Sequence, residues 1–384
     1  MVIYGSIDSV GAKMNRIPFV GKNRSEKLQH AQSLFEQGFR AIDQGNLDEG
    51  LLFYQEAFLI QTELLDIENP EICAVVNRLG EALEQPGRQA AAQEFFARSL
   101  KQFSNSRDPN YLHLGYMVEW LGNHFFGLDD LTGARGWYEL ALSVFETTLG
   151  TDDRQVLFVL QKLVGLVYNE GDLLEAKRLI DRVLAIDEKV FGAQHPKVAS
   201  DLSNLGKIQH GLGDLPGARQ TFEQAIAIEE QTLNWDNARL ATDLRSLGAV
   251  LEALGDLTGA KECLERVLAI DEKTFGPLHP KVSDDLSDLG LLLDKAGDLP
   301  GARTRLEDAL KIDEQVFGEE HSRIFDDLSR LGKVLVQLED LPAALTNYER
   351  VIKMGEKTFG PEHARLAPEL QHLGDIQRAL GKCV

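Results

Sequence analysis

The chain is poor in residues that would indicate a disulfide-bonded, metal-binding or membrane protein. Its 384 residues include only three cysteines, Cys73, Cys263 and Cys383, which lie far apart. Neither a disulfide framework nor a zinc site is therefore indicated, and a cytoplasmic protein with reduced thiols is expected. No apolar run approaches the roughly 18 residues that span a bilayer, so no membrane partner is predicted.

Basic residues are scarce relative to acidic ones. The 40 Lys and Arg face 61 Asp and Glu, which gives a formal net charge of −21. A nucleic-acid partner requires a basic face that displaces counterions, so none is expected. If the partner is charged, a basic segment is favoured. Residues 1–24 are locally basic, and we expect them to form a flexible tail instead of a signal peptide.

Signatures of catalysis are also missing. The sequence contains no GxSxG, no HExxH and no P-loop, and no cysteine lies in a recognisable nucleophile motif. Acidic residues recur at Asp187, Asp271 and Asp313, but we expect them on the solvated face of successive helices and not around one scissile bond. No enzyme activity and no cofactor are therefore predicted.

What the sequence has in abundance is a strict period of 42 residues. One glycine column is interrupted only at Asp129 and Glu339, and it comprises Gly45, Gly87, Gly171, Gly213, Gly255, Gly297 and Gly381. A second column, broken at Val164, comprises Gly38, Gly80, Gly122, Gly206, Gly248, Gly290, Gly332 and Gly374. Repetition without insertions predicts a solenoid, whose function is to hold a partner.

Each copy has the pattern of two amphipathic helices. In residues 196–237, Val198, Leu202 and Ile208 are spaced along one helical face, Gly213 can end that helix, and Pro216 can begin the next. No segment alternates with period two, so strands are not predicted.

Small residues should allow the two helices of a copy to approach closely. We expect Gly206 to face Ala218 and Ala225 across the turn. A large residue in this column, such as leucine at Gly248, is expected to destabilise the protein by about 2–4 kcal/mol.

The phrase AIDEKVFGAQHPKVASDLSNLGKIQHGLGDLPGA, residues 185–218, resembles the longer tetratricopeptide repeat of kinesin light chains. The usual tetratricopeptide unit has about 34 residues, and each unit here is longer. The resemblance covers roughly residues 28–381. It implies an all-α, right-handed superhelical α-solenoid over residues 25–384, with eight helix-turn-helix units and a C-terminal capping helix at 365–380. We expect first helices centred near residues 38, 80, 122, 165, 206, 248, 290 and 332.

Four histidines occupy one lattice column: His195, His279, His321 and His363. Successive members lie one repeat apart, whereas zinc ligands must converge at ~2 Å from one ion. No metal site is therefore predicted, and we expect this column to shape the loop between repeats.

The resemblance also implies a concave groove, lined by the first helices, that binds a peptide or a partner's helix. Its tentative lining is Tyr116, Trp120, Asn123, Phe126, Phe158, Lys162, Tyr168, Asn204, Asp284, Asp288 and Asp326. Exposed aromatic side chains favour binding, but some of these rings could instead pack between helices, and the aspartates could simply face solvent. The asparagine ladder of peptide-clamping relatives is represented only by Asn204, so a kinesin role is not expected.

Two functions fit this pattern. The first is a non-enzymatic scaffold or adaptor that binds a partner protein or peptide, whose hydrophobic anchor is flanked by Lys or Arg. The alternative is a sensing module in which a peptide or effector controls a partner enzyme or signalling protein.

Overall fold

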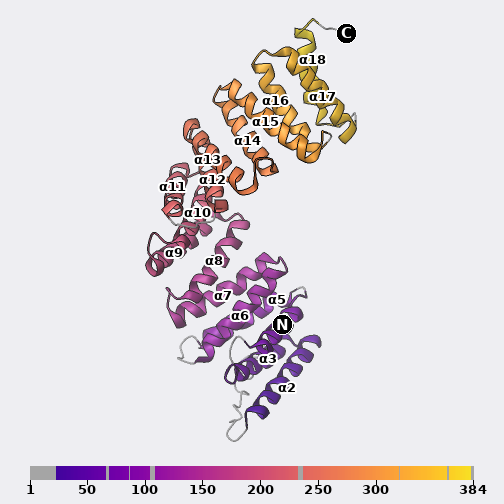
Figure 1. Cartoon of the computed structure of the whole chain (residues 1–384). Helices are drawn as coiled ribbons and strands as arrows, with labels where there is room; N and C mark the ends of the chain where they lie inside the picture. The colour runs from indigo at the N-terminus through magenta and orange to yellow at the C-terminus, as the bar shows by residue number, and fades with distance from the viewer. Residues whose placement is uncertain are drawn as a thin grey trace, which may run out of the picture. The chain divides into compact units, whose positions relative to one another are not determined.

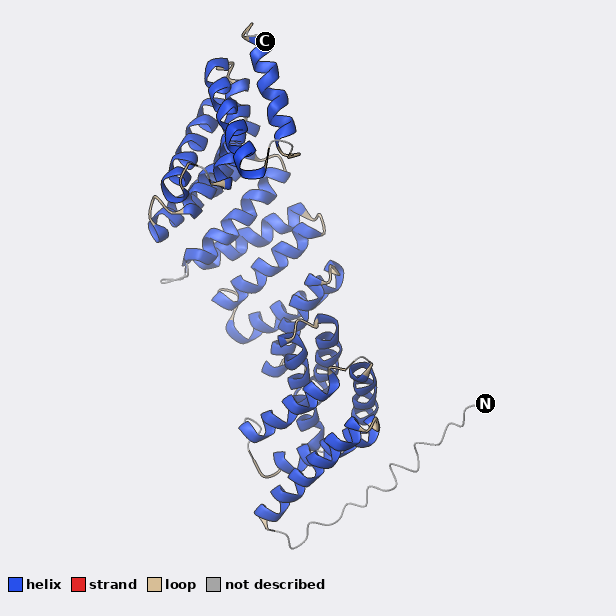
Figure 2. Cartoon of the chain, turned by 90° about the vertical axis from the view of Figure 1, so that its right-hand side faces the viewer, coloured by secondary structure: helices blue, strands red, loops and turns tan. Residues whose placement is uncertain are grey.

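In the computed structural model, the described residues are 23–65, 69–85, 87–103, 109–231, 237–319, 321–360 and 363–381. They form seventeen α-helices, and no strand occurs among them (Figure 2). This confirms the all-α fold class. Most of the expected N-terminal tail, residues 1–22, lies outside the described residues. None of the helices in the described ranges is both long and apolar enough to cross a bilayer.

The helices alternate between a first and a second member of each repeat. The first helices are α2 (Arg24–Asp43), α4 (Pro70–Leu83), α6 (Pro109–Gly127), α8 (Arg154–Asn169), α10 (Pro196–Gly211), α12 (Asn237–Ala253), α14 (Pro280–Lys295) and α16 (Ser322–Gln337). The second helices are α3 (Leu47–Thr62), α5 (Arg88–Phe103), α7 (Leu131–Leu149), α9 (Leu173–Phe191), α11 (Leu215–Gln231), α13 (Leu257–Phe275), α15 (Leu299–Phe317) and α17 (Leu341–Phe359). The last helix, α18 (Leu366–Ala379), follows α17.

The chain divides into two compact units, residues 1–179 and 180–384. In the first unit α2 packs against α3 and α6 against α7, while α4 contacts α6 (Figure 1). In the second unit α10 to α17 form four antiparallel pairs, and each second helix also packs on the first helix that follows it. Helix pairs joined by short turns are the repeating structural element of both units.

The turn inside each pair explains the first glycine column. Its glycines have positive φ, between 67° and 88°, a conformation that disfavours residues with a Cβ. The two interrupting residues adopt the same conformation, with φ of 61° at Asp129 and 59° at Glu339. From the third repeat onward an aspartate follows and caps the second helix, as where the side chain of Asp256 accepts from the N–H of Gly259.

The histidine column lies at the start of α10, α14, α16 and α18 in the second unit. Nδ1 of His195 accepts from the N–H of Lys197, and His279, His321 and His363 make the equivalent contact. Each imidazole also packs on the phenylalanine four residues earlier, as His195 does on Phe191 at 4.7 Å between ring centroids. These histidines therefore shape the loop between repeats, as expected.

The second glycine column makes room for the second helix of the same repeat. An added Cβ at Gly206 would stand 2.9 Å from the ring of Phe222, and at the equivalent Gly248 and Gly290 it would also lie 3.7 Å and 3.4 Å from the backbone oxygens of Ala260 and Ala302, in the alanine column. Tyr54, Tyr138 and Tyr348 fill the same position over the glycines of other repeats, each fully or almost fully buried. The sequence identified the close approach to the alanine column but not the large side chain beside it, because an α-helix also brings the residue four positions after the alanine over the glycine.

Candidate functional site

Two exposed aromatic rings and a lysine meet on neighbouring first helices of the first unit. Phe126 ends α6 and is 40% exposed, and Phe158 begins α8 and is 39% exposed. Nζ of Lys162 lies 5.0 Å from the ring centroid of Phe126 and 5.5 Å from that of Phe158. We call these three residues the aromatic–lysine surface. An ammonium over two ring faces orients both rings and leaves apolar ring area accessible.

The other predicted residues of this unit are more enclosed. Tyr116 packs on Phe145 at 5.1 Å between ring centroids, and the edge of Trp120 meets Phe58 at 6.4 Å. Both rings are half-buried, so part of each packs between helices, which was the open alternative.

Asn123 and Tyr168 have different roles on the same two helices. Asn123 accepts a hydrogen bond from the hydroxyl of Tyr138 at 2.8 Å, so its carbonyl is occupied by the protein itself. Tyr168 is 41% exposed near the end of α8 and remains available to a partner.

A buried carboxyl group lies next to Trp120. Glu119 is 6% exposed, and desolvation raises its pKa to about 7, against the opposing effects of Asn123 and Lys162. The positive charge of Lys162 therefore lies above the rings and near a carboxyl group that is partly protonated at neutral pH. This surface carries little net negative charge, which suits an apolar side chain better than a basic one.

The predicted acidic residues of the second unit are largely paired. Asp284 forms an ion pair with Arg323 at 2.6 Å, and Asp326 forms one with Arg365 at 2.5 Å. Asp288 is exposed on α14 without such a pair. Each arginine comes from the following repeat, 39 residues later, so a contiguous acidic face does not form. Asn204 is exposed on α10.

The recurring acids of the second helices lie in the interior, not on the solvated face that we expected. Asp187, Asp271 and Asp313 are each 0% exposed. Desolvation and the adjacent Asp187 carboxyl raise the pKa of Asp201 to about 8. Desolvation and Asp313 likewise raise the pKa of Asp327 to about 7. The second helices α9, α13 and α15 thus each place a carboxyl group against one from the next first helix.

A buried polar ladder links consecutive first helices of the second unit. The hydroxyl of Ser203 donates to Asp243, and that of Ser287 donates to Asp327 at 3.4 Å. At the equivalent position Arg245 donates to Asp285 at 2.5 Å and lies 3.3 Å from Asp271. The acidic lattice of the sequence is therefore accounted for by contacts between repeats.

Family models of the tetratricopeptide repeat match most of the C-terminal half of the chain. One matches residues 158–231 and 239–315, and another matches residues 328–365. The chain is a tetratricopeptide-repeat protein. Curated protein sequences give no match to it.

Several solved structures are similar to parts of this tetratricopeptide-repeat protein at low sequence identity. One from Podosopora anserina, assigned as a kinesin light chain with nearly identical repeats, is 24% identical, covers 53% of this chain and 96% of its own, and has a TM-score of 0.48. BtubC from P. vanneervenii is 20% identical over 66% of this chain and 93% of its own, with a TM-score of 0.42. The apo form of RapI is 13% identical over 74% and 98%, with a TM-score of 0.44.

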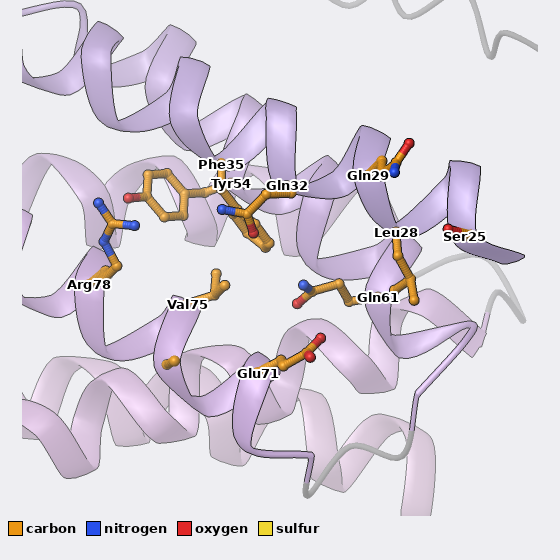
Figure 3. A pocket seen from close by; sticks show the side chains of 11 residues that line it. Ser25, Leu28, Gln29, Gln32, Phe35, Tyr54, Gln61, Glu71, Val75 and Arg78 are labelled. Atoms are coloured by element: carbon orange, nitrogen blue, oxygen red, sulfur yellow. The ribbon is translucent and has the colours of Figure 1, made fainter.

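The tetratricopeptide-repeat protein also has a pocket that the sequence did not indicate. It lies between α2 and α4, above α3, and has a volume of about 560 Å³ (Figure 3). Gln29 and Gln32 of α2 and Glu71 and Arg78 of α4 form its rim, and the amide of Gln61 points into it from α3.

Part of this lining could have been found in the sequence. Gln32 and Arg78 occupy the repeat positions of Tyr116 and Trp120, which the lattice assigned to the groove. They were not among the residues predicted to line the groove, which begin at Tyr116 in the third repeat. Gln61 belongs to a second helix, so only the packing of α3 under α2 and α4 brings its amide to the pocket.

Proposed function

We propose that this protein is a non-enzymatic scaffold that binds a partner protein or peptide in a concave groove lined by the solvent-exposed faces of its first helices. Solenoid repeats present extended surfaces of this kind, and tetratricopeptide repeats typically serve as interaction scaffolds. The buried acids of the second unit contact one another and the repeat core, which explains them without a catalytic role.

The observation that carries the proposal is the exposure of Phe126 and Phe158 on adjacent helices, with Lys162 over both rings. Aromatic rings held in place by their neighbours lose little conformational entropy on binding, and each anchor can contribute about 1–3 kcal/mol. Tyr168, also exposed on α8, extends the surface. The partner therefore presents a hydrophobic anchor.

Basic residues next to that anchor are the second part of the proposal. The net charge of −21 favours association with a basic segment and speeds its capture at low salt. Asp288, exposed and without an ion pair, is the residue of the predicted acidic set that best supports this attraction. We place the protein in the cytoplasm, in keeping with the free, buried Cys263.

Affinity capture with the full-length chain as bait tests the proposal. Wild type, Phe158→Ala and Leu174→Ala are compared by quantitative mass spectrometry of proteins retained from the native host. Leu174 is 73% exposed but lies on the second helix α9, so it is a matched control for the loss of an exposed apolar side chain. The proposal expects a partner that Leu174→Ala retains and Phe158→Ala loses by at least about tenfold. A partner retained equally by all three baits would refute the proposal that the aromatic–lysine surface binds it.

The sensing alternative involves the same binding event. It is favoured over simple scaffolding only if the captured partner is an enzyme or signalling protein whose activity changes when the full chain is added.

A further inference from the structure

The pocket between α2 and α4 differs chemically from the aromatic–lysine surface. Its walls are apolar at depth, with Leu28, Phe35 and Val75 lining it, whereas its rim bears amides and charges. Figure 3 shows Gln61 and Glu71 on the same side of the opening, with Arg78 at the opposite end beside Tyr54. The pocket therefore has an apolar middle, with the negatively charged Glu71 at one end and the positively charged Arg78 at the other.

The amide of Gln61 is the feature that points to a ligand. This side chain is 4% exposed, and its Oε1 has no hydrogen-bond donor within the described structure. A buried acceptor without a donor is destabilising, so a donor supplied by a ligand would recover that free energy. Gln61 points into the pocket, so a ligand there can supply it (Figure 3).

Glu71 adds a charge to the same end. It is exposed in the first turn of α4, where its N–H is held by the side chain of the N-cap Asn69 at 2.9 Å. No cation of the described chain pairs with its carboxylate. Arg78, the cation that lines the pocket, lies over the ring of Phe39 at 5.3 Å and at the other end. The Gln61–Glu71 end therefore presents one neutral and one anionic acceptor.

We propose that this pocket receives one lysine or arginine side chain from an extended segment of the partner. The methylene stem lies along Leu28, Phe35 and Val75, and the terminal N–H groups donate to Oε1 of Gln61 and to the carboxylate of Glu71. Long basic side chains carry both features, an apolar stem and several donors. This inference rests on the proposed scaffold function and specifies one feature of its partner. The net charge of −21 also attracts a basic side chain.

The chain provides a matched control for the role of Gln61. Gln55 lies on the same helix, is 2% exposed, and also has an Oε1 without a donor, but it does not line the pocket. Replacing either glutamine by leucine removes one buried, unpaired acceptor at similar volume, so both changes should be tolerated by the fold. Only the change at Gln61 should affect binding.

The test uses an immobilised panel of twelve-residue peptides with the fluorescently labelled full chain as probe. Each peptide with a central lysine or arginine has three twins, in which norleucine, glutamine or glutamate replaces that residue. Wild type, Gln61→Leu, Gln55→Leu, Glu71→Lys and Phe158→Ala are compared, with thermal unfolding as a check on folding.

For wild type and Gln55→Leu, the proposal expects lysine and arginine peptides to bind at least about tenfold better than their norleucine twins. Gln61→Leu should abolish that preference, and Glu71→Lys should shift it toward the glutamate twins. Equal binding of the twins by wild type overturns the inference, as does a preference that survives Gln61→Leu. Peptides lost by Phe158→Ala but indifferent to the central residue would keep the scaffold function and refute this pocket. Failure to bind any panel member overturns both.

Discussion

The ring of Phe222 lies directly over Gly206, so that a Cβ added to this glycine would stand 2.9 Å from two atoms of the ring and 3.0 Å from a third. Gly248 occupies the same repeat position, yet the nearest atom to its added Cβ is that of Cys263 at 3.5 Å. The two glycines share a lattice column but face different amounts of space.

Because of this difference, adding one methyl group at each glycine is predicted to change the free energy of unfolding differently. Gly206→Ala should lower the free energy of unfolding by about 1–2 kcal/mol, because the buried ring must shift. Gly248→Ala should leave it unchanged or raise it by up to about 1 kcal/mol, because alanine is the better helix former. Urea unfolding of both variants measures this, and equal destabilisation would show that the ring does not decide the outcome.

Replacing the turn residue Glu339 by glycine should stabilise the protein. It has φ of 59°, where a residue with a Cβ is strained. Glu339→Gly is expected to raise the free energy of unfolding by about 0.5–1 kcal/mol.

Gly297, at the same repeat position with φ of 80° and no neighbour within 4 Å of an added Cβ, supplies the reverse change. Gly297→Glu should destabilise by about 1–2 kcal/mol through its backbone alone. The denaturant midpoints of both variants test these two predictions. A Gly297→Glu variant more stable than wild type would contradict the role given to the positive φ.

Arg245 should be important for the stability of the second unit. Its guanidinium group bridges the buried carboxyl groups of Asp271 and Asp285. Arg245→Met leaves the buried Asp285 without its cation, while Asp271 keeps Lys281 at 3.2 Å, and the change should cost about 3–5 kcal/mol. Arg266 pairs with Glu230 at the surface, so Arg266→Met should cost at most about 1 kcal/mol. Similar losses in thermal unfolding for the two variants would refute the distinction.

The carboxyl pairs predict that stability falls as the pH rises. The pKa of Asp201 is about 8 in the folded chain, above the usual value of ~3.9. A raised folded pKa means that the folded state binds the proton more tightly. This contribution is therefore complete below about pH 4 and is lost as the pH rises through 8.

Asp201→Asn should remove that dependence. The melting temperature of wild type is expected to fall more between pH 5 and pH 8 than that of the variant, and the variant should be the more stable at pH 8. Parallel pH profiles for the two proteins would show that Asp201 does not keep its proton on folding.

Trp120 and Phe126 should separate binding from stability. Trp120→Ala is expected to weaken partner binding at least about tenfold, because large aromatic side chains contribute most to interface affinity. Because the edge of Trp120 packs on Phe58, we expect this change to lower stability as well. Phe126→Ala, at a 40% exposed ring, should weaken binding with little change in the melting temperature. Once a partner is known, calorimetry on both variants tests this, and unaltered affinity in both would contradict the prediction.

The candidate site was predictable in part. Phe126 and Phe158 could be placed on a common surface because helical periodicity and the 42-residue lattice fix which positions of adjacent helices are neighbours. The same lattice placed Asp284 and Asp326 on an acidic face, but it did not reveal that Arg323 and Arg365 reach back from the next repeat to pair with them. Such pairing depends on the length and direction of two side chains.

The sequence by itself determined the helices, their pairing and the positions of the turns. Glycine with positive φ, the aspartate cap after it and the histidine cap of the next repeat act over a few residues, so their spacing alone was sufficient. The tertiary structure decided which side chains lie inside. Asp187 is adjacent in sequence to charged residues that face solvent, yet the first helix of the following repeat covers it completely. Gln61 reaches the pocket only because two first helices pack over α3. Whether a side chain is buried depends on how helices from other parts of the chain pack around it, and a local sequence pattern does not specify that packing.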